Sequence, residues 1–220
     1  MELLIAQILQ ELKPFNARLV AVSKTKPVGD IRKIYDLGQR IFGENRVQEL
    51  MAKVDLLPED IEWHLIGHLQ RNKVKYIAPF IGMIHSVDSL ELAKEINKQA
   101  ARNDRRIPVL LQIRIAEEET KFGIETNKID QFVEEMLAKN WHHLEIAGVM
   151  GMASFVDDEK QISAEFNRLK EIFDHLKSRY FEEETSFREI SMGMSGDYQI
   201  ALQQGSTMVR IGSLIFGARN

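Results

Sequence analysis

Residues 18–27 read RLVAVSKTKP, and this stretch holds a strand, the turn after it and the start of a helix. The run from Arg18 to Ser23 is rich in apolar and β-branched residues, as strands are, and Pro27 suits the first turn of a helix. The turn itself has none of the glycines that a dinucleotide-binding turn requires. The stretch therefore predicts one β/α unit outside the dinucleotide-binding folds.

The same alternation of a short strand with a longer helix recurs along the rest of the chain. The eight predicted strands cover residues 18–23, 40–44, 62–66, 83–87, 108–115, 144–150, 189–192 and 208–212. An amphipathic helix is predicted within 1–13, and another helix is predicted to begin just after Pro27. The remaining predicted helices cover residues 45–56, 70–77, 89–101, 126–138, 158–180 and 197–204. Such alternation requires parallel pairing, and eight units favour a closed barrel over an open doubly wound sheet, which stays the alternative. We expect residues 1–220 to form one α/β domain, a single (β/α)8 TIM barrel with an extra N-terminal helix.

Composition excludes several classes of function. The chain has 220 residues, 44% of them apolar, and a formal net charge of −4 without a long block of one sign, so nucleic acid is not an expected partner. It has no cysteine, which excludes disulfides, thiolate metal sites and a cysteine nucleophile. No apolar run approaches the roughly 18 residues of a membrane span, and no export signal is visible. We expect a soluble, cytoplasmic protein without a membrane partner.

Chemistry in such barrels gathers where the strands end, and the first strand ends at Lys24. Lys24 continues the alternation of Val20 and Val22, so it points to the barrel mouth if they point inward. Apolar walls would lower the proton affinity of its amine, and a neutral amine can attack an aldehyde to form an imine. The alternative is a lysine that extends along the rim to water. Lys26, further along the turn, is expected at the surface.

The ends of the last two strands resemble a phosphate site. Residues 192–197 (MGMSGD) join a strand to a helix, so backbone N–H groups and the Ser195 hydroxyl can face an anion. Residues 209–213 (VRIGS) end the next strand, and Gly212 permits a close approach of the backbone. The alternative is that these glycines only turn the chain and that Ser195 caps a helix.

Five sequence patterns at the predicted strand ends match one family. They are residues 21–27 (AVSKTKP), 42–45 (FGEN), 63–70 (WHLIGHLQ), 85–88 (HSVD) and 191–195 (SMGMS), and residues 205–219 (GSTMVRIGSLIFGAR) are the most specific stretch. With these patterns the sequence resembles the pyridoxal phosphate homeostasis proteins, which look like the barrel domain of alanine racemase standing alone. The match spans nearly the whole chain.

The resemblance implies a fold-type III barrel that holds pyridoxal 5'-phosphate (PLP) as a Schiff base, an internal aldimine, on Lys24. It further implies that Ser195, Gly212 and Ser213 hold the phosphate, that Arg210 faces the pyridine nitrogen and that Asn45 lies beside the ring. Two features depart from the family: the N-terminal helix is shorter, and Ser213 stands where many relatives have threonine. The hydroxyl is kept, so the phosphate assignment stands.

An arginine at the pyridine nitrogen stays charged and cannot accept a proton, so Arg210 leaves that nitrogen unprotonated and the ring a weaker electron sink. Racemases overcome this with a second base from an additional domain, whereas only residues 213–220 follow Gly212 here. We therefore expect no dedicated catalytic residue, and a carrier that stores or delivers PLP in vitamin B6 homeostasis. The alternatives are a weak amino-acid racemase and a barrel enzyme of phosphorylated compounds without PLP. Arg210 could also be a buried ion-pair partner.

The expected partners are PLP and PLP-accepting apoenzymes, and the chain is expected to be a monomer. His64 and His68 have a spacing that would suit zinc on a helix, but Gly67 and the strand-to-turn context argue against a helix there. No metal is therefore expected, and the sequence assigns no role to either histidine.

Overall fold

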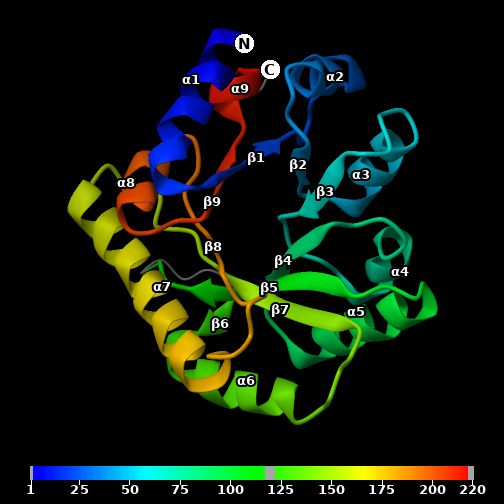
Figure 1. Ribbon diagram of the computed structural model, residues 1–220, viewed down its shortest axis with the longest axis vertical. Helices are drawn as coiled ribbons and strands as arrows, with labels where there is room; N and C mark the ends of the chain where they lie inside the picture. The colour runs from blue at the N-terminus through cyan, green and yellow to red at the C-terminus, as the bar shows by residue number, and fades with distance from the viewer. Residues whose placement is uncertain (1, 117–121, 218–220) are drawn as a thin grey trace.

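The computed structural model describes residues 2–116 and 122–217. Its strands are β1 (Arg18–Val22), β2 (Ile41–Glu44), β3 (Glu62–Leu65), β4 (Met83–Val87), β5 (Ile107–Arg114), β6 (Ile124–Glu125), β7 (Leu144–Met150), β8 (Glu189–Ser191) and β9 (Met208–Ile211). They are hydrogen-bonded in the order β4-β3-β2-β1-β9-β8-β7-β5-β6, and a further parallel pairing of β4 with β5 closes the ring. All strands except β6 therefore form the predicted eight-stranded parallel barrel (Figure 1).

Helices surround this ring. They are α1 (Glu2–Leu12), α2 (Val28–Asp36), α3 (Val47–Val54), α4 (Val74–Ile77), α5 (Leu90–Arg102), α6 (Ile129–Leu137), α7 (Glu159–Tyr180), α8 (Tyr198–Gln203) and α9 (Ser213–Phe216), with the 3-10 turns η1 (Lys13–Phe15), η2 (Arg71–Lys73) and η3 (Thr126–Lys128). The extra N-terminal helix α1 lies beside α9, the last helix (Figure 1). No helix in the described ranges combines the length and apolar character of a membrane span.

Several elements differ in detail from the sequence prediction. The helix expected at 70–77 is a 3-10 turn followed by a single α-helical turn, and the helix expected at 126–138 also begins with a 3-10 turn. The two-residue strand β6, which pairs with β5, and the four-residue helix α9 were not predicted. Elements this short carry too few residues for a periodic pattern.

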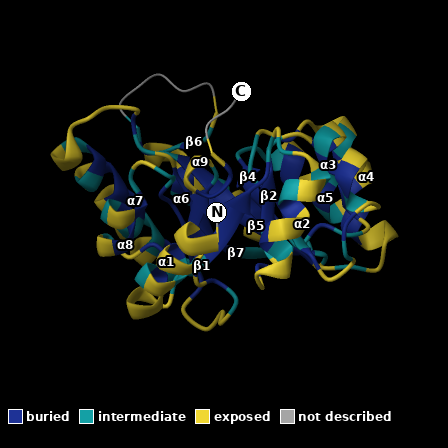
Figure 2. Ribbon diagram, turned by 90° about the horizontal axis from the view of Figure 1, so that it is seen from above, coloured by how far each residue is buried: buried dark blue, intermediate teal, exposed yellow. Residues whose placement is uncertain are grey.

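Alternate residues of β1, β4, β5, β7 and β9 fill two separate apolar layers. Outward residues such as Leu19 and Ala21 pack under the helices in the larger hydrophobic cluster. Inward residues fill the barrel itself, namely Val20, Met83, Leu110, Ala147, Met150 and Met208. The buried strands surrounded by helices with exposed outer faces are visible in Figure 2. Because successive side chains of a strand point to opposite faces, this alternation decides which polar residues face the interior.

Candidate functional site

Arg210 lies on the inner face of the barrel. It pairs with Val20 across β1 and β9, and Val20 belongs to the cluster that fills the barrel. The side chain is buried, with 4% of the residue exposed, and Nη1 donates to Ser191 Oγ at 2.6 Å while Nη2 donates to the Gly151 carbonyl at 3.0 Å. Burial lowers the pKa of Arg210 to about 10, so the guanidinium remains charged at neutral pH. Arg210 is thus a buried cation held by neutral groups.

The turn after β8 contacts the turn after β9. Ser195 Oγ accepts a hydrogen bond from the Gly212 backbone N–H at 3.3 Å. Asp197 closes the β8 turn, because its carboxylate accepts from the Met194 N–H at 2.5 Å. Among the described residues, the N–H groups of Ser195 and Gly196 donate to no protein acceptor. Two residues from the predicted phosphate site are therefore adjacent, beside backbone N–H groups that can bind an anion.

Gly212 also lies against the end of β1. A Cβ atom built on Gly212 would be 3.1 Å from the Val22 carbonyl oxygen and 3.2 Å from Val22 Cβ, closer than most real contacts. Ser213 follows as the exposed first residue of α9. The last strand-to-helix turn is thus packed directly against the strand that leads to Lys24.

Lys24 lies in a tight turn just beyond β1 rather than on the strand itself. The Lys26 N–H donates to the Ser23 carbonyl at 3.1 Å across this turn, and Thr25 has a φ of 64°. Lys24 is partly buried. Lys26, expected at the surface, is partly buried, and its amine donates to the Phe216 and Gly217 carbonyls at 3.1 and 3.2 Å. Lys26 therefore ties the Lys24 turn to the end of α9.

A buried ionic cluster forms hydrogen bonds with the backbone of the Lys24 turn. Lys53 Nζ donates to Glu44 Oε1 at 2.8 Å, to Glu49 Oε1 at 2.6 Å and to the Ser23 carbonyl at 2.9 Å. The Ser23 hydroxyl donates to Glu44 at 2.6 Å, and the Thr25 N–H donates to Glu49. Desolvation raises the pKa of Glu44, although its bonds to Lys53 and Ser23 oppose this. The cluster fixes the backbone on both sides of Lys24.

Asn45 follows β2 at the same end of the barrel. Its Oδ1 atom is buried and has no hydrogen-bond partner among the described residues. Its backbone packs closely on the next turn, where a Cβ on Gly67 would be 2.4 Å from the Asn45 carbonyl oxygen. A buried amide oxygen without a partner costs free energy, so this atom is suited to accept from a bound molecule.

The groups that hold Arg210 are not evident from the sequence. Ser191 and Gly151 received no role, although both lie at strand ends. From the sequence, His85 is only one residue of the pattern at 85–88, yet its Nδ1 lies 3.0 Å from Ser191 Oγ inside the barrel. The alternation of residues along each strand could have identified these two, because His85 and Ser191 are polar residues at inward positions, where apolar residues are the rule.

His64 and His68 have separate environments. His64 is fully buried and its Nδ1 lies 2.9 Å from His85 Nε2, whereas His68 is exposed and stacks on Phe122 with ring centroids 4.0 Å apart. Within residues 2–116 and 122–217, no three His, Asp or Glu side chains form a group that could hold a metal ion.

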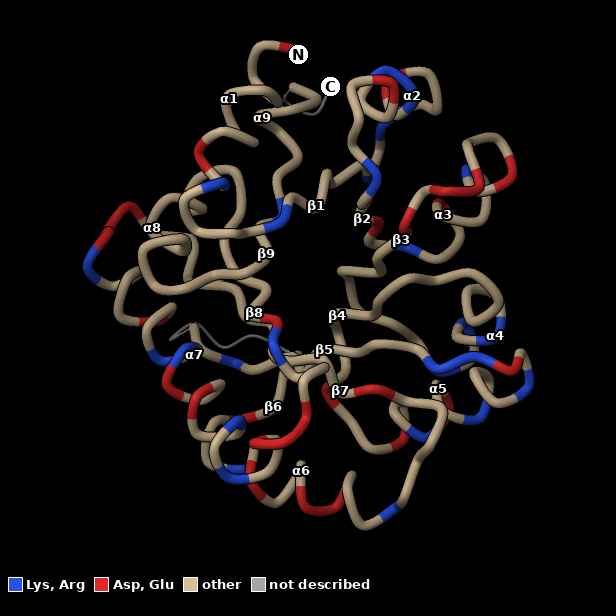
Figure 3. Tube along the Cα trace, viewed as in Figure 1, with Lys and Arg blue, Asp and Glu red and all other residues tan. Residues whose placement is uncertain are grey.

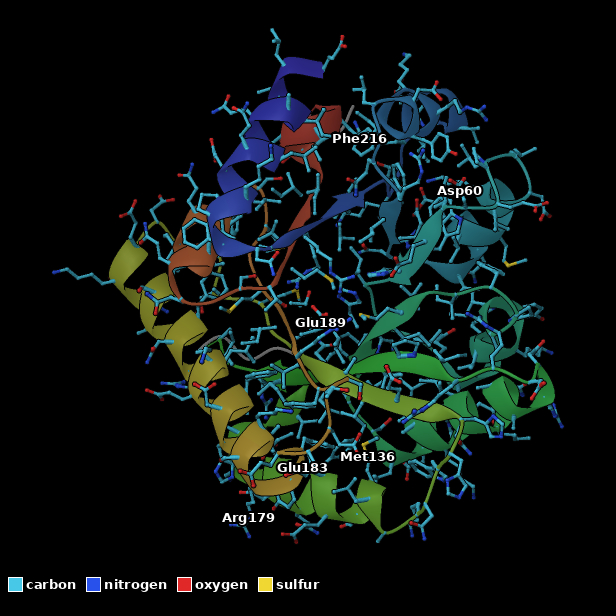
Figure 4. All side chains as sticks on the ribbon, in the orientation of Figure 1. Asp60, Met136, Arg179, Glu183, Glu189 and Phe216 are labelled. Atoms are coloured by element: carbon cyan, nitrogen blue, oxygen red, sulfur yellow. The ribbon has the colours of Figure 1, made fainter. Side chains whose placement is uncertain are left out.

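Charged residues otherwise lie mainly on the outer helices and loops (Figure 3). An exception is Glu189, which Figure 4 labels inside the ring of strands, while Asp60 and Arg179 lie at the periphery. Glu189 pairs with Arg18 at 2.8 Å, at the end of the barrel where β8 and β1 begin. Phosphate-site residues and this ion pair thus occupy opposite ends of the barrel.

Comparison with known proteins gives consistent matches over almost the whole chain. The family model for the alanine racemase N-terminal domain matches residues 5–220. The pyridoxal phosphate homeostasis protein of Aquifex aeolicus is 38% identical over 204 residues, covering 92% of this chain and 87% of its own. The protein of that name from Homo sapiens is 40% identical over 222 residues, covering 96% of this chain and 80% of its own.

A solved structure extends this likeness to three dimensions. PipY of Synechococcus elongatus PCC7942, in its structure with PLP bound, superposes with a TM-score of 0.87 at 32% identity. The match covers 98% of this chain and 99% of PipY.

Proposed function

Because the chain belongs to the pyridoxal phosphate homeostasis proteins, which share the alanine racemase N-terminal domain, we propose that it binds PLP at the carboxyl ends of its barrel strands. The amine of Lys24 would bond to the cofactor aldehyde. The observation that carries this proposal is the hydrogen bond between Ser195 and Gly212, because it joins the two turns of the proposed phosphate site next to the end of β1. The bound PLP of PipY supports it.

The side chains present suit this cofactor. The Ser195 and Ser213 hydroxyls and the N–H groups of the β8 turn can donate to phosphate oxygens. The unpartnered Asn45 Oδ1 is an acceptor near the mouth, and Arg210 supplies a fixed positive charge inside the barrel. When bound, PLP would supply an electrophilic aldehyde and an electron-accepting ring. The residues around it bind and orient it.

The proposed role is storage or delivery of PLP within vitamin B6 homeostasis, without dedicated turnover. The curated relatives are named for homeostasis rather than for a reaction. Arg210 argues in the same direction, because it donates only and stays charged, so it cannot protonate the ring nitrogen in the way a carboxylic acid does. PLP-accepting apoenzymes as partners, a monomeric state, one domain over residues 1–220 and a cytoplasmic location belong to the same proposal.

Absorbance titration with PLP tests the proposal. Wild type should develop a visible band that Lys24→Ala lacks, because only an amine within reach of the aldehyde can bond to it. Lys139→Ala is the matched control, since Lys139 is an exposed lysine between α6 and β7, at the other end of the barrel. A Lys24→Ala protein with the wild-type band would contradict the assignment. Sustained racemisation of an amino acid by wild type would contradict the carrier role.

A further inference from the structure

A row of hydrogen-bonded side chains crosses the barrel interior and ends on Arg210. Its members, called the polar row below, are Glu62, His64, His85, Ser191 and Arg210. Glu62 Oε1 lies 2.8 Å from His64 Nε2, and His64 Nδ1 lies 2.9 Å from His85 Nε2. His85 Nδ1 lies 3.0 Å from Ser191 Oγ, which accepts from Arg210 Nη1 at 2.6 Å. Four strands, β3, β4, β8 and β9, therefore contribute to one continuous path.

The middle of the polar row has no access to water. His64, His85 and Ser191 are all 0% exposed, whereas the Glu62 side chain, on the first residue of β3, is 42% exposed. A buried polar atom without a partner costs about 1–3 kcal/mol, so each ring nitrogen must be matched to a group of the opposite kind. The row therefore has to use its donors and acceptors in a consistent order.

The two ends of the polar row determine that order. A carboxylate only accepts, so His64 must carry its proton on Nε2 and leave Nδ1 bare. His85 must then donate from Nε2 to His64, which leaves His85 Nδ1 to accept from the Ser191 hydroxyl. Ser191 Oγ in turn accepts from Arg210, which only donates. With both imidazoles neutral, all four contacts are satisfied and every hydrogen bond is donated in one direction, from Arg210 toward Glu62.

Burial keeps both imidazoles neutral. Desolvation lowers the pKa of His64 and, more strongly, that of His85. The charged groups that face them come from several strands: Glu62 and Glu189 favour the protonated form of His64, whereas Arg18 disfavours it in both rings and Arg210 disfavours it in His85. A proton added to His64 Nδ1 would face the proton on His85 Nε2, and a proton added to His85 Nδ1 would remove the acceptor for the Ser191 hydroxyl.

We propose that Glu62, His64, His85 and Ser191 are positioning residues that fix the orientation of the Arg210 guanidinium through this single direction of hydrogen bonding. Arg210 needs such a device because no carboxylate among the described residues forms an ion pair with it, and only Ser191 and the Gly151 carbonyl hold it. The consequence for PLP rests on the proposed function, whereas the order of donors and acceptors does not.

Nitrogen-15 NMR of the histidines in the full chain, prepared without cofactor, tests the order directly at pH 7. His64 and His85 should both be neutral with the proton on Nε2. A proton on Nδ1 of either ring would overturn the proposal. Because no cofactor is present, this result is independent of whether the chain binds PLP.

Variants of Glu62 test whether the exposed end sets the direction. Glu62→Gln keeps an acceptor oxygen and should preserve the Nε2 form of both rings. Glu62→Ala removes the acceptor, and His64 should then show a mixture of the two neutral forms. A single Nε2 form in Glu62→Ala would show that Glu62 does not set the direction and would overturn its part in the proposal.

Ser191→Ala tests the effect on the proposed cofactor site. The loss of one of two contacts to a buried cation should weaken PLP binding about tenfold and shift the absorbance band of the bound cofactor. Ser206→Ala is the matched control, because Ser206 is also buried but donates to the Met192 carbonyl at 2.8 Å and lies outside the polar row. Wild-type affinity and spectrum in Ser191→Ala, or the same change in Ser206→Ala, would overturn the proposal. Failure of wild type to bind PLP would instead refute the proposed function.

Discussion

At the scale of single residues, the buried amine of Lys53 is the group on which the Lys24 turn depends. Replacing it by methionine leaves Glu44, which is 0% exposed, without its cation. We expect Lys53→Met to lower the free energy of unfolding by about 3–5 kcal/mol, as for other broken buried pairs. Urea denaturation measures this. Lys33→Met breaks an exposed pair with Asp30 and should change stability by less than about 1 kcal/mol; equal losses in the two variants would contradict the account.

The sequence predicts the residues at the strand ends of the candidate site better than it predicts the buried residues that hold them in place. Ser195 follows the predicted strand at 189–192 and Gly212 ends the predicted strand at 208–212, and neighbouring strands that end together bring these residues together. The contacts of Lys53 and His85 depend on how far each strand is shifted against its neighbour, and the pattern of apolar residues does not give that shift for short strands. The residues that hold Lys24 and Arg210 in place could therefore not be predicted from the sequence.

At the scale of elements, the close packing of the β9–α9 turn on β1 makes Gly212 sensitive to any side chain. Gly212→Ala should push this turn away from Val22, because the backbone carbonyl at 3.1 Å cannot move independently of the strand. We expect PLP affinity to fall about tenfold, which corresponds to about 1.4 kcal/mol. Gly29→Ala in α2 has open space around its new Cβ and is the control. Unchanged affinity in Gly212→Ala would contradict the proposed phosphate site.

The strands and long helices agree with the sequence prediction within a few residues, for a physical reason. Helix α7 is long enough to show a repeating apolar stripe, and it begins where Asp158 accepts from the backbone N–H groups of Lys160 and Gln161 at 2.9 and 3.3 Å. The single turn of α4 and the two residues of β6 offer no such pattern. Their formation depends on neighbours in the fold rather than on local sequence.

At the scale of the whole molecule, the buried histidines link folding to pH. The folded state keeps His64 and His85 neutral below their ordinary pKa of 6.5, while the unfolded chain binds protons there. The unfolded state thus binds more protons, so stability should fall as pH decreases below about 6.5, by up to about 1.4 kcal/mol per pH unit for each ring. Protonation of Glu44, whose pKa is raised, acts in the opposite direction.

Urea denaturation at several pH values between 7 and 5.5 isolates the contribution of one ring. His85→Gln removes a titrating group but keeps a hydrogen-bonding side chain, so its stability should depend less steeply on pH than that of wild type. His142→Gln removes an exposed imidazole outside the polar row and is the control substitution. If the stability of wild type and of His85→Gln depended equally on pH, that result would contradict a neutral, buried His85.

The central claim is that the amine of Lys24 lies within covalent reach of an aldehyde whose phosphate binds at the turns after β8 and β9. Borohydride reduction of the protein with PLP, followed by peptide mapping in a mass spectrometer, tests this most directly. The account predicts one reduced adduct, on the peptide that contains Lys24. An adduct confined to other lysines, or none in a protein that binds PLP, would contradict it.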